Sequence, residues 1–317
     1  MREEVCIFMV RQFVVLYFVE AGPESMDASK ERHLIRDFFM NFSLLYSAVR
    51  INEEFPLKKR RDFMSNLLEN LQKNVVFVLE FLAVVAVLFV VAYAAEKLAQ
   101  KRAGVNEKIF HTRKIVMIGM FSAIASILML FEIQMPFAPF FYKLDFSELP
   151  ALIGTFAFGP VAGVMIEFCK ILLKLLFKST STAFVGELAN FAVGCSFILP
   201  ASIIYLFKKN KKTAMIGCGV GTIILTIFGT AFNAVYLLPK FAELFGMSLE
   251  GIVAMGTQIN PGITNVTTFV IMAVAPLNLI KGTSVSVVTL LVYKSLSPIL
   301  KTQGYHAKEK NLGLSHE

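Results

Sequence analysis

Long apolar stretches separated by short charged ones run through the chain from about residue 75 onward. They predict helices at 75–95, 115–131, 147–158, 161–177, 187–207, 214–239 and 277–299. Several approach the roughly 20 residues that a helix needs to cross a hydrocarbon core of about 30 Å. The helices at 147–158 and 161–177 are shorter and are separated by a Gly-Pro break, which favours tilted helices in a compact bundle. The pattern predicts an all-α integral membrane fold, a six-transmembrane-helix bundle with an extra N-terminal hydrophobic helix.

Polar segments divide the chain into four parts. These are an N-terminal extension at 1–73, an extra transmembrane helix with a cytoplasmic linker at 74–111, a six-helix membrane domain at 112–300 and a cytoplasmic tail at 301–317. Three interpretations of the extension stay open. It is a poorly ordered segment, or residues 1–63 lie upstream of a true start at Met64, or a signal peptide is present without a clear small-residue cleavage site after Val19.

The composition supports the membrane assignment. Hydrophobic residues make up 56% of the chain, charged residues 17%, and the mean hydropathy is +0.65, whereas a soluble domain carries about 25% charge. Soluble globular, collagen-like, disulfide-stapled and disordered classes are therefore excluded. The net charge of +8 arises after residue 73, and in a membrane protein such basicity marks cytoplasmic loops rather than a nucleic-acid partner.

Lysine and arginine are distributed unevenly between the loops. The connections at 96–114 and 208–212 and the C-terminal end together hold 14, and the opposite side holds three, at Lys143, Lys178 and Lys240. The positive-inside rule places the first set in the cytoplasm, with both ends of the six-helix core. A spanning helix at 75–95 would then put the basic run at 58–61 on the outer side, against that rule.

The chain lacks the common catalytic and nucleotide-binding motifs. There is no P-loop, HExxH, GxSxG or EF-hand loop, and the four cysteines and four histidines lack metal-ligand spacing. We therefore expect no enzyme activity, no metal site and no cofactor, and energy for transport from other subunits. A lipid-modifying membrane enzyme is an alternative, although Asp145 is the only Asp after residue 62. A self-powered transporter would need an inverted repeat, and none is evident.

Charged residues inside apolar stretches are costly, about 2.5–3.5 kcal/mol each at the bilayer centre, and need partners, water or a ligand. Glu167, Lys170 and Lys174 share one helical face. They form either an internal ion pair or the wall of a polar pocket. Asn278 and Lys281, three residues apart, either hydrogen-bond a planar ligand or are a packing amide beside a snorkelling lysine.

Two further asparagines, Asn190 and Asn233, lie in the predicted outer half of their helices. Three asparagines converging with Lys281 would suit a flat heteroaromatic ligand, because buried amides need their donors and acceptors met. The loop at 132–146 is rich in Pro and aromatic residues, which either cover such a ligand or form an interface belt.

Small residues recur on the predicted helix at 115–131, at Gly119 and Ala123 with Ser122, Ala125 and Ser126 nearby. Such faces let helices approach closely in membranes. They serve either ordinary packing within the bundle or docking of another membrane subunit.

Four motifs resemble one family of membrane proteins. The segments at 143–151 (KLDFSELPA), 158–164 (FGPVAGV), 186–191 (GELANF) and 278–282 (NLIKG) are similar to those of the riboflavin-specific substrate-binding subunits (S-components) of energy-coupling-factor (ECF) vitamin transporters. The resemblance covers about residues 112–300. The extra helix and everything before it depart from that pattern.

The resemblance implies a six-helix bundle that binds riboflavin near the outer face of the bacterial cell membrane. It also implies assembly with a transmembrane coupling protein and two cytoplasmic ATPase subunits, with Gly119 and Ala123 as the docking surface for the coupling protein. The implied ligand contacts are Asn233, Asn278 and Lys281, covered by the first external loop around Tyr142 and Leu144; Asn190 is a further candidate. An S-component for a B6 vitamer or thiamine is the alternative within the same class.

Overall fold

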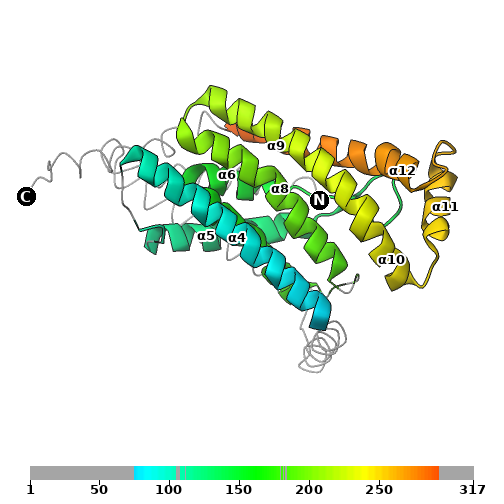
Figure 1. Ribbon diagram of the computed structural model, residues 1–317. Helices are drawn as coiled ribbons and strands as arrows, with labels where there is room; N and C mark the ends of the chain where they lie inside the picture. Colours follow the sequence, from blue (N-terminus) through cyan, green and yellow to red (C-terminus); the bar gives the residue numbers. More distant parts are fainter. Residues whose placement is uncertain are drawn as a thin grey trace, which may run out of the picture. The chain divides into compact units, whose positions relative to one another are not determined.

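The computed structural model (Figure 1) describes residues 75–104, 108–110, 112–178, 180, 182 and 184–292. The predicted extension at 1–73 and the predicted tail at 301–317 lie outside these residues. The helices are α4 (Val75–Ala103), α5 (Thr112–Leu130), α6 (Glu148–Phe158), α7 (Pro160–Phe177), α8 (Val185–Phe207), α9 (Lys211–Phe232), α10 (Leu238–Phe245), α11 (Leu249–Ile259) and α12 (Val266–Phe269). Two π-helical segments, η1 (Asn233–Leu237) and η2 (Val270–Val274), continue α9 and α12, and helix resumes at 275–292.

Four helical stretches in the described part of the chain are long and apolar enough to cross a membrane. They are Phe77–Ala103, Val185–Phe207, Lys211–Phe245 and Val266–Val292, the last of which we term the last span. The apolar parts of α5 and α6 are shorter, and α7 carries three charged residues. The protein is therefore a multi-pass membrane protein, as its composition predicts.

The last span begins earlier than the sequence pattern suggests. We expected the final helix to begin near residue 277, but it starts at Val266, where Asn265 and Thr268 form a reciprocal capping box. The connection before it, expected to hold one short helix, contains both α10 and α11. The helix continues through η2 because a π-bulge inserts a residue without breaking the helix.

The break between α6 and α7 follows directly from the sequence. Gly159 has φ 91°, a conformation that favours glycine, and Pro160 occupies the first turn of α7. A Cβ at Gly159 would lie 2.9 Å from an Oε atom of Glu96 in α4. The same glycine therefore allows the turn and the close approach of α4.

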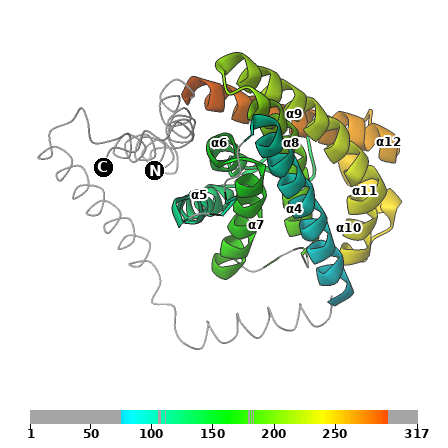
Figure 2. The same cartoon turned by 60° about the vertical axis from the view of Figure 1, so that its left-hand side comes forward.

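Close helix packing forms the centre of the bundle. Along α9, Gly217 and Gly221 face backbone carbonyls of α8, since a Cβ there would lie 2.6 Å from Ala201 O and 2.7 Å from Phe197 O. Small residues allow this approach in membranes. On the other side, α4 lies along α7 and α8, as both views show (Figures 1 and 2).

The basic connections lie together. Arg102, at the end of α4, lies over the ring of Phe207 at the end of α8, 5.2 Å from its centroid. Lys114, at the start of α5, pairs with Glu96 at 2.7 Å. The lysine-rich connections after α4 and after α8 are thus at the same end of the bundle, as the uneven charge distribution predicts.

Candidate functional site

The loop at 131–147, between α5 and α6, packs over the other end of the bundle. Its strands β1 (Ile133–Gln134) and β2 (Lys143–Leu144) pair antiparallel, with Ile133 opposite Leu144. Tyr142 and Leu144 are buried in a cluster with side chains of α10, α11, α12 and η2. The ring of Phe141 lies 5.1 Å from that of Phe241 in α10. Phe141 and Tyr142 of the aromatic loop are therefore packed against the bundle, whereas Phe140 of the same loop is exposed.

Tyr142 connects this loop to η1. Its hydroxyl donates to Asn233 Oδ1 at 2.7 Å, and Asn233 Nδ2 donates to Gly229 O at 2.7 Å. Burial raises the pKa of the Tyr142 phenol above its ordinary value, so the group stays a hydrogen-bond donor. The loop and the π-helical segment are thus joined by one buried bond.

Asn278 lies next to the same glycine. A Cβ on Gly229 would be 2.5 Å from Asn278 Nδ2. This Nδ2 is buried and has no hydrogen-bond partner among the described residues. An unsatisfied buried donor costs about 1–3 kcal/mol, so a ligand carbonyl that accepted from it would remove that cost. Asn233 and Asn278, both predicted site residues, therefore come together at Gly229.

Lys281, one turn beyond Asn278, is buried between two carboxylates. Its Nζ lies 2.9 Å from Glu148 Oε1 and 3.5 Å from Asp145 Oδ2. Burial by itself would raise the pKa of the Asp145 carboxyl, but Lys281, Lys170 and hydrogen bonds from Ser147 hold this pKa below its usual range. Asp145 is therefore ionised, and it ties the loop to the last span.

Lys170 extends these contacts into α7. Its Nζ lies 2.7 Å from Glu167 Oε2 and 3.3 Å from Glu148 Oε1, and it donates to Ser147 Oγ at 2.9 Å. We term the five charged residues of this group the buried charge cluster: Asp145, Glu148, Glu167, Lys170 and Lys281. The internal ion pair considered from the sequence is present, and it is joined to Lys281 through Glu148.

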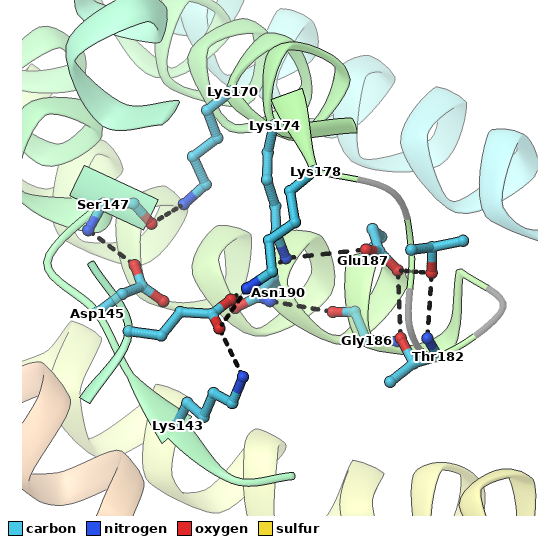
Figure 3. A network of polar contacts seen from close by, with 12 residues as sticks. Lys143, Asp145, Ser147, Lys170, Lys174, Lys178, Thr182, Gly186, Glu187 and Asn190 are labelled. Carbon is cyan, nitrogen blue, oxygen red and sulfur yellow. Dashed lines mark hydrogen bonds and ion pairs between the residues drawn. The ribbon is translucent and has the colours of Figure 1, made fainter. Parts of the chain in front are cut away.

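A second polar group lies at the edge of the site (Figure 3). Glu132 accepts from Lys143 at 2.7 Å and from Lys178 at 3.2 Å. Lys174 lies 3.5 Å from Glu132 and 3.8 Å from Glu187. Partial burial would raise the pKa of Glu132, but these three lysines lower it overall. Lys174 thus lies between the carboxylates of Glu132 and Glu187.

Asn190 is bonded within its own helix. Its side-chain amide donates to Gly186 O at 3.1 Å, one turn back in α8, and the side chain is half-buried. The structure therefore joins Tyr142, Asn233 and Asn278, with Lys281 one turn away, whereas the hydrogen bond of Asn190 stays within its own helix.

The predicted docking face remains open. Gly119 and Ala123 are exposed on α5, and a Cβ at Gly119 would meet nothing within 4 Å. Packing within the described bundle therefore does not use this face. Among the described residues, no group of three His, Cys, Asp or Glu side chains is placed to hold a metal ion.

The region that carries this site matches a known protein family. Residues 113–293 match the family described as ECF transporter, substrate-specific component. The chain belongs to this family. The matched region holds every residue of the buried charge cluster and both asparagines at Gly229, while α4 lies outside it.

Several known proteins are similar to this substrate-specific component over about 60% of its length. The riboflavin transporter RibU of Staphylococcus aureus (strain TCH60) is 35% identical over 60% of this chain and 93% of its own length. The riboflavin transporter FmnP of Bacillus subtilis (strain 168) is 31% identical over 60% of this chain and 95% of its own. A solved S component of a bacterial ECF transporter is 36% identical, with a TM-score of 0.47, over 60% of this chain and 98% of that one.

Sequence reasoning missed the counterions of this substrate-specific component. It identified Lys281 but not Asp145 and Glu148 as its partners, because Asp145 is 136 residues away along the chain. The sequence did hold a signal for these counterions. Asp145, Ser147 and Glu148 form a polar group at the start of a predicted helix, in a chain that is otherwise strongly apolar.

Proposed function

We propose that this chain is the riboflavin-binding membrane subunit of an ECF-type importer. The observation that carries the proposal is that two relatives named riboflavin transporters align with this chain over 93% and 95% of their own length. The geometry supports it. The free amide donor of Asn278 and the buried ammonium of Lys281 suit a flat ring with carbonyl groups on one edge.

Binding, rather than chemistry, is the role of these residues. The apolar and aromatic side chains around Tyr142 and Phe269, whose rings lie 6.1 Å apart, would contact the faces of the isoalloxazine ring. Asn233, Asn278 and Lys281 would hydrogen-bond its polar edge. Leu144, a buried residue of the loop itself, would pack beside the ring.

The proposal includes six spans and an orientation. The six spans are α5, α6, α7, α8, the stretch Lys211–Phe245 and the last span, with α4 as a seventh. The basic end, with Arg102 and Lys114, faces the cytoplasm. The loop at 131–147 then faces outward, where riboflavin enters.

The exposed face of α5 is the proposed contact with a transmembrane coupling protein, which works with two cytoplasmic ATPase subunits. Gly119 and Ala123 would allow a partner helix to approach the α5 backbone. The neighbouring side chain Val116 is 63% exposed, so the face is apolar as well as flat.

Purification without added ligand tests the riboflavin assignment. We expect the protein to retain a flavin with visible absorption and, after its removal, to bind added riboflavin with a quench of flavin fluorescence. Thiamine and pyridoxine, titrated in parallel, should not compete. Competition by either vitamin, or absence of flavin binding by the folded protein, would contradict the proposal.

Tyr142→Phe tests the contact between the loop and η1. It leaves Asn233 Oδ1 without its partner at 2.7 Å, so we expect riboflavin binding to weaken by about 1–3 kcal/mol. Isothermal titration of the folded variant measures this. Tyr93→Phe, which removes a hydroxyl from an exposed residue of α4, is the matched control and should bind as the wild type does.

A further inference from the structure

The helix α4 is the part of the described bundle that the family match leaves unexplained, because the match begins at residue 113. Its sequence is apolar, with most of its surface turned away from the bundle. It nevertheless carries two acidic residues, Glu80 and Glu96, and each of them contacts the core at a different end of the helix.

At the loop end, Glu80 contacts the π-helical segment that carries Asn233. The hydroxyl of Tyr236 donates to Glu80 Oε2 at 2.9 Å. Tyr236 stacks on Phe232, with ring centroids 5.3 Å apart and planes within 6°. A carboxylate on an apolar helix is stabilised by such a donor, since hydrogen bonds to charged groups are stronger than neutral ones.

Tyr236 and Asn233 belong to the same five-residue segment but contact different elements. Asn233 is buried and accepts from Tyr142, whereas Tyr236 contacts α4. A π-turn has poorer packing than regular α-helix and is often found at functional sites. The position of η1 therefore depends on side-chain contacts to two elements, the loop at 131–147 and α4.

At the opposite end, Glu96 fixes α4 to the core. It pairs with Lys114 at 2.7 Å, and its Oε2 accepts from the backbone N of Val161 at 3.3 Å. Between the two ends, α4, α8 and α9 line an apolar groove of about 600 Å³. The polar contacts at the two ends therefore add to the packing of Phe81 against Phe191, 5.7 Å between ring centroids, in setting where α4 lies along the bundle.

We propose that α4 is a built-in positioning helix for the substrate site, in which Glu80 holds Tyr236 and so keeps η1 in the position that presents Asn233 to the ligand. Glu80 and Tyr236 are positioning residues and do not touch the ligand. The inference rests on the proposed riboflavin function. It adds a contribution from a helix outside the matched region to a site built inside it.

Riboflavin titration of the full chain tests the proposal with Tyr236→Phe and Glu80→Met, which remove the donor and the acceptor. Each should raise the riboflavin Kd by about three- to tenfold, the size of one lost hydrogen bond. The double variant should be no weaker than the weaker single one, because both remove the same contact. Glu80→Gln keeps an acceptor and should restore binding to about that of the wild type.

Glu243→Met is the matched control, since Glu243 also accepts one hydrogen bond at 2.9 Å, from Lys240, on the exposed side of α10. Its Kd should equal that of the wild type. Wild-type Kd values for both Tyr236→Phe and Glu80→Met, or multiplying effects in the double variant, would overturn the inference and leave the riboflavin assignment intact. A wild-type protein that binds no riboflavin would overturn the assignment itself. If Glu80→Met does not fold, Tyr236→Phe decides, because it removes a single oxygen.

Discussion

Lys281→Met should lower the free energy of unfolding by about 3–5 kcal/mol and abolish measurable riboflavin binding. The substitution leaves Asp145 and Glu148 buried without their shared cation, and breaking a buried ion pair from one side is strongly destabilising. Denaturant unfolding in detergent measures the first effect and riboflavin titration the second. Lys240→Met, at an exposed ion pair, is the control and should change neither.

A second substitution separates folding from binding. Lys281→Met together with Asp145→Asn restores the net charge of the buried charge cluster, so stability should return most of the way to the wild-type value. Riboflavin binding should not return, because the ammonium group proposed to contact the ring is still missing. Recovery of binding in the double variant would show that Lys281 acts on the fold alone.

Lys170→Met is expected to have the largest effect on stability of any single lysine substitution in α7. Lys170 is fully buried, and its Nζ contacts Glu167, Glu148 and Ser147. Its removal would leave two buried carboxylates close to each other, and we expect a loss of about 3–5 kcal/mol or failure to fold. Thermal unfolding and the yield of monodisperse protein measure this.

Lys178→Met, directly after the end of α7, provides the comparison. Lys178 is about half exposed and pairs with Glu132 at 3.2 Å, and such surface pairs contribute about 0–1 kcal/mol. Equal losses for the two variants would mean that burial of Lys170 does not determine its contribution.

The helices of this protein were predictable because apolar runs of membrane length are unmistakable in a chain with 17% charged residues. Errors arose at helix ends. The final helix, expected to begin at residue 277, begins at Val266 because a capping box starts it there, and η2 carries it on toward Asn278. Period and hydropathy do not report caps or π-turns.

The sequence predicted which polar side chains meet in the candidate site, but it did not predict which residues pair with Lys281. Asn233, Asn278 and Tyr142 were expected to meet, and the bond from Tyr142 to Asn233 together with the position of Asn278 over Gly229 joins them. The pairing of Lys281 with Glu148 depends on how the first loop folds over the last span. That long-range packing has no local signature in the sequence. Asn190 stays a predicted ligand contact, since only one of its amide N–H groups is used, in a bond to Gly186 O like that of Asn233 to Gly229 O.

The two π-helical segments mark where the chain can change length without disturbing the site. The segments η1 and η2 contact each other, and Asn278 follows η2 by one turn. A π-bulge takes up one extra residue while the helix on either side of it continues in phase. Deleting one residue from η2 would therefore give regular α-helix and leave Asn278 and Lys281 facing Gly229 and Glu148. In regular helix, by contrast, one lost residue rotates every later side chain by about 100°.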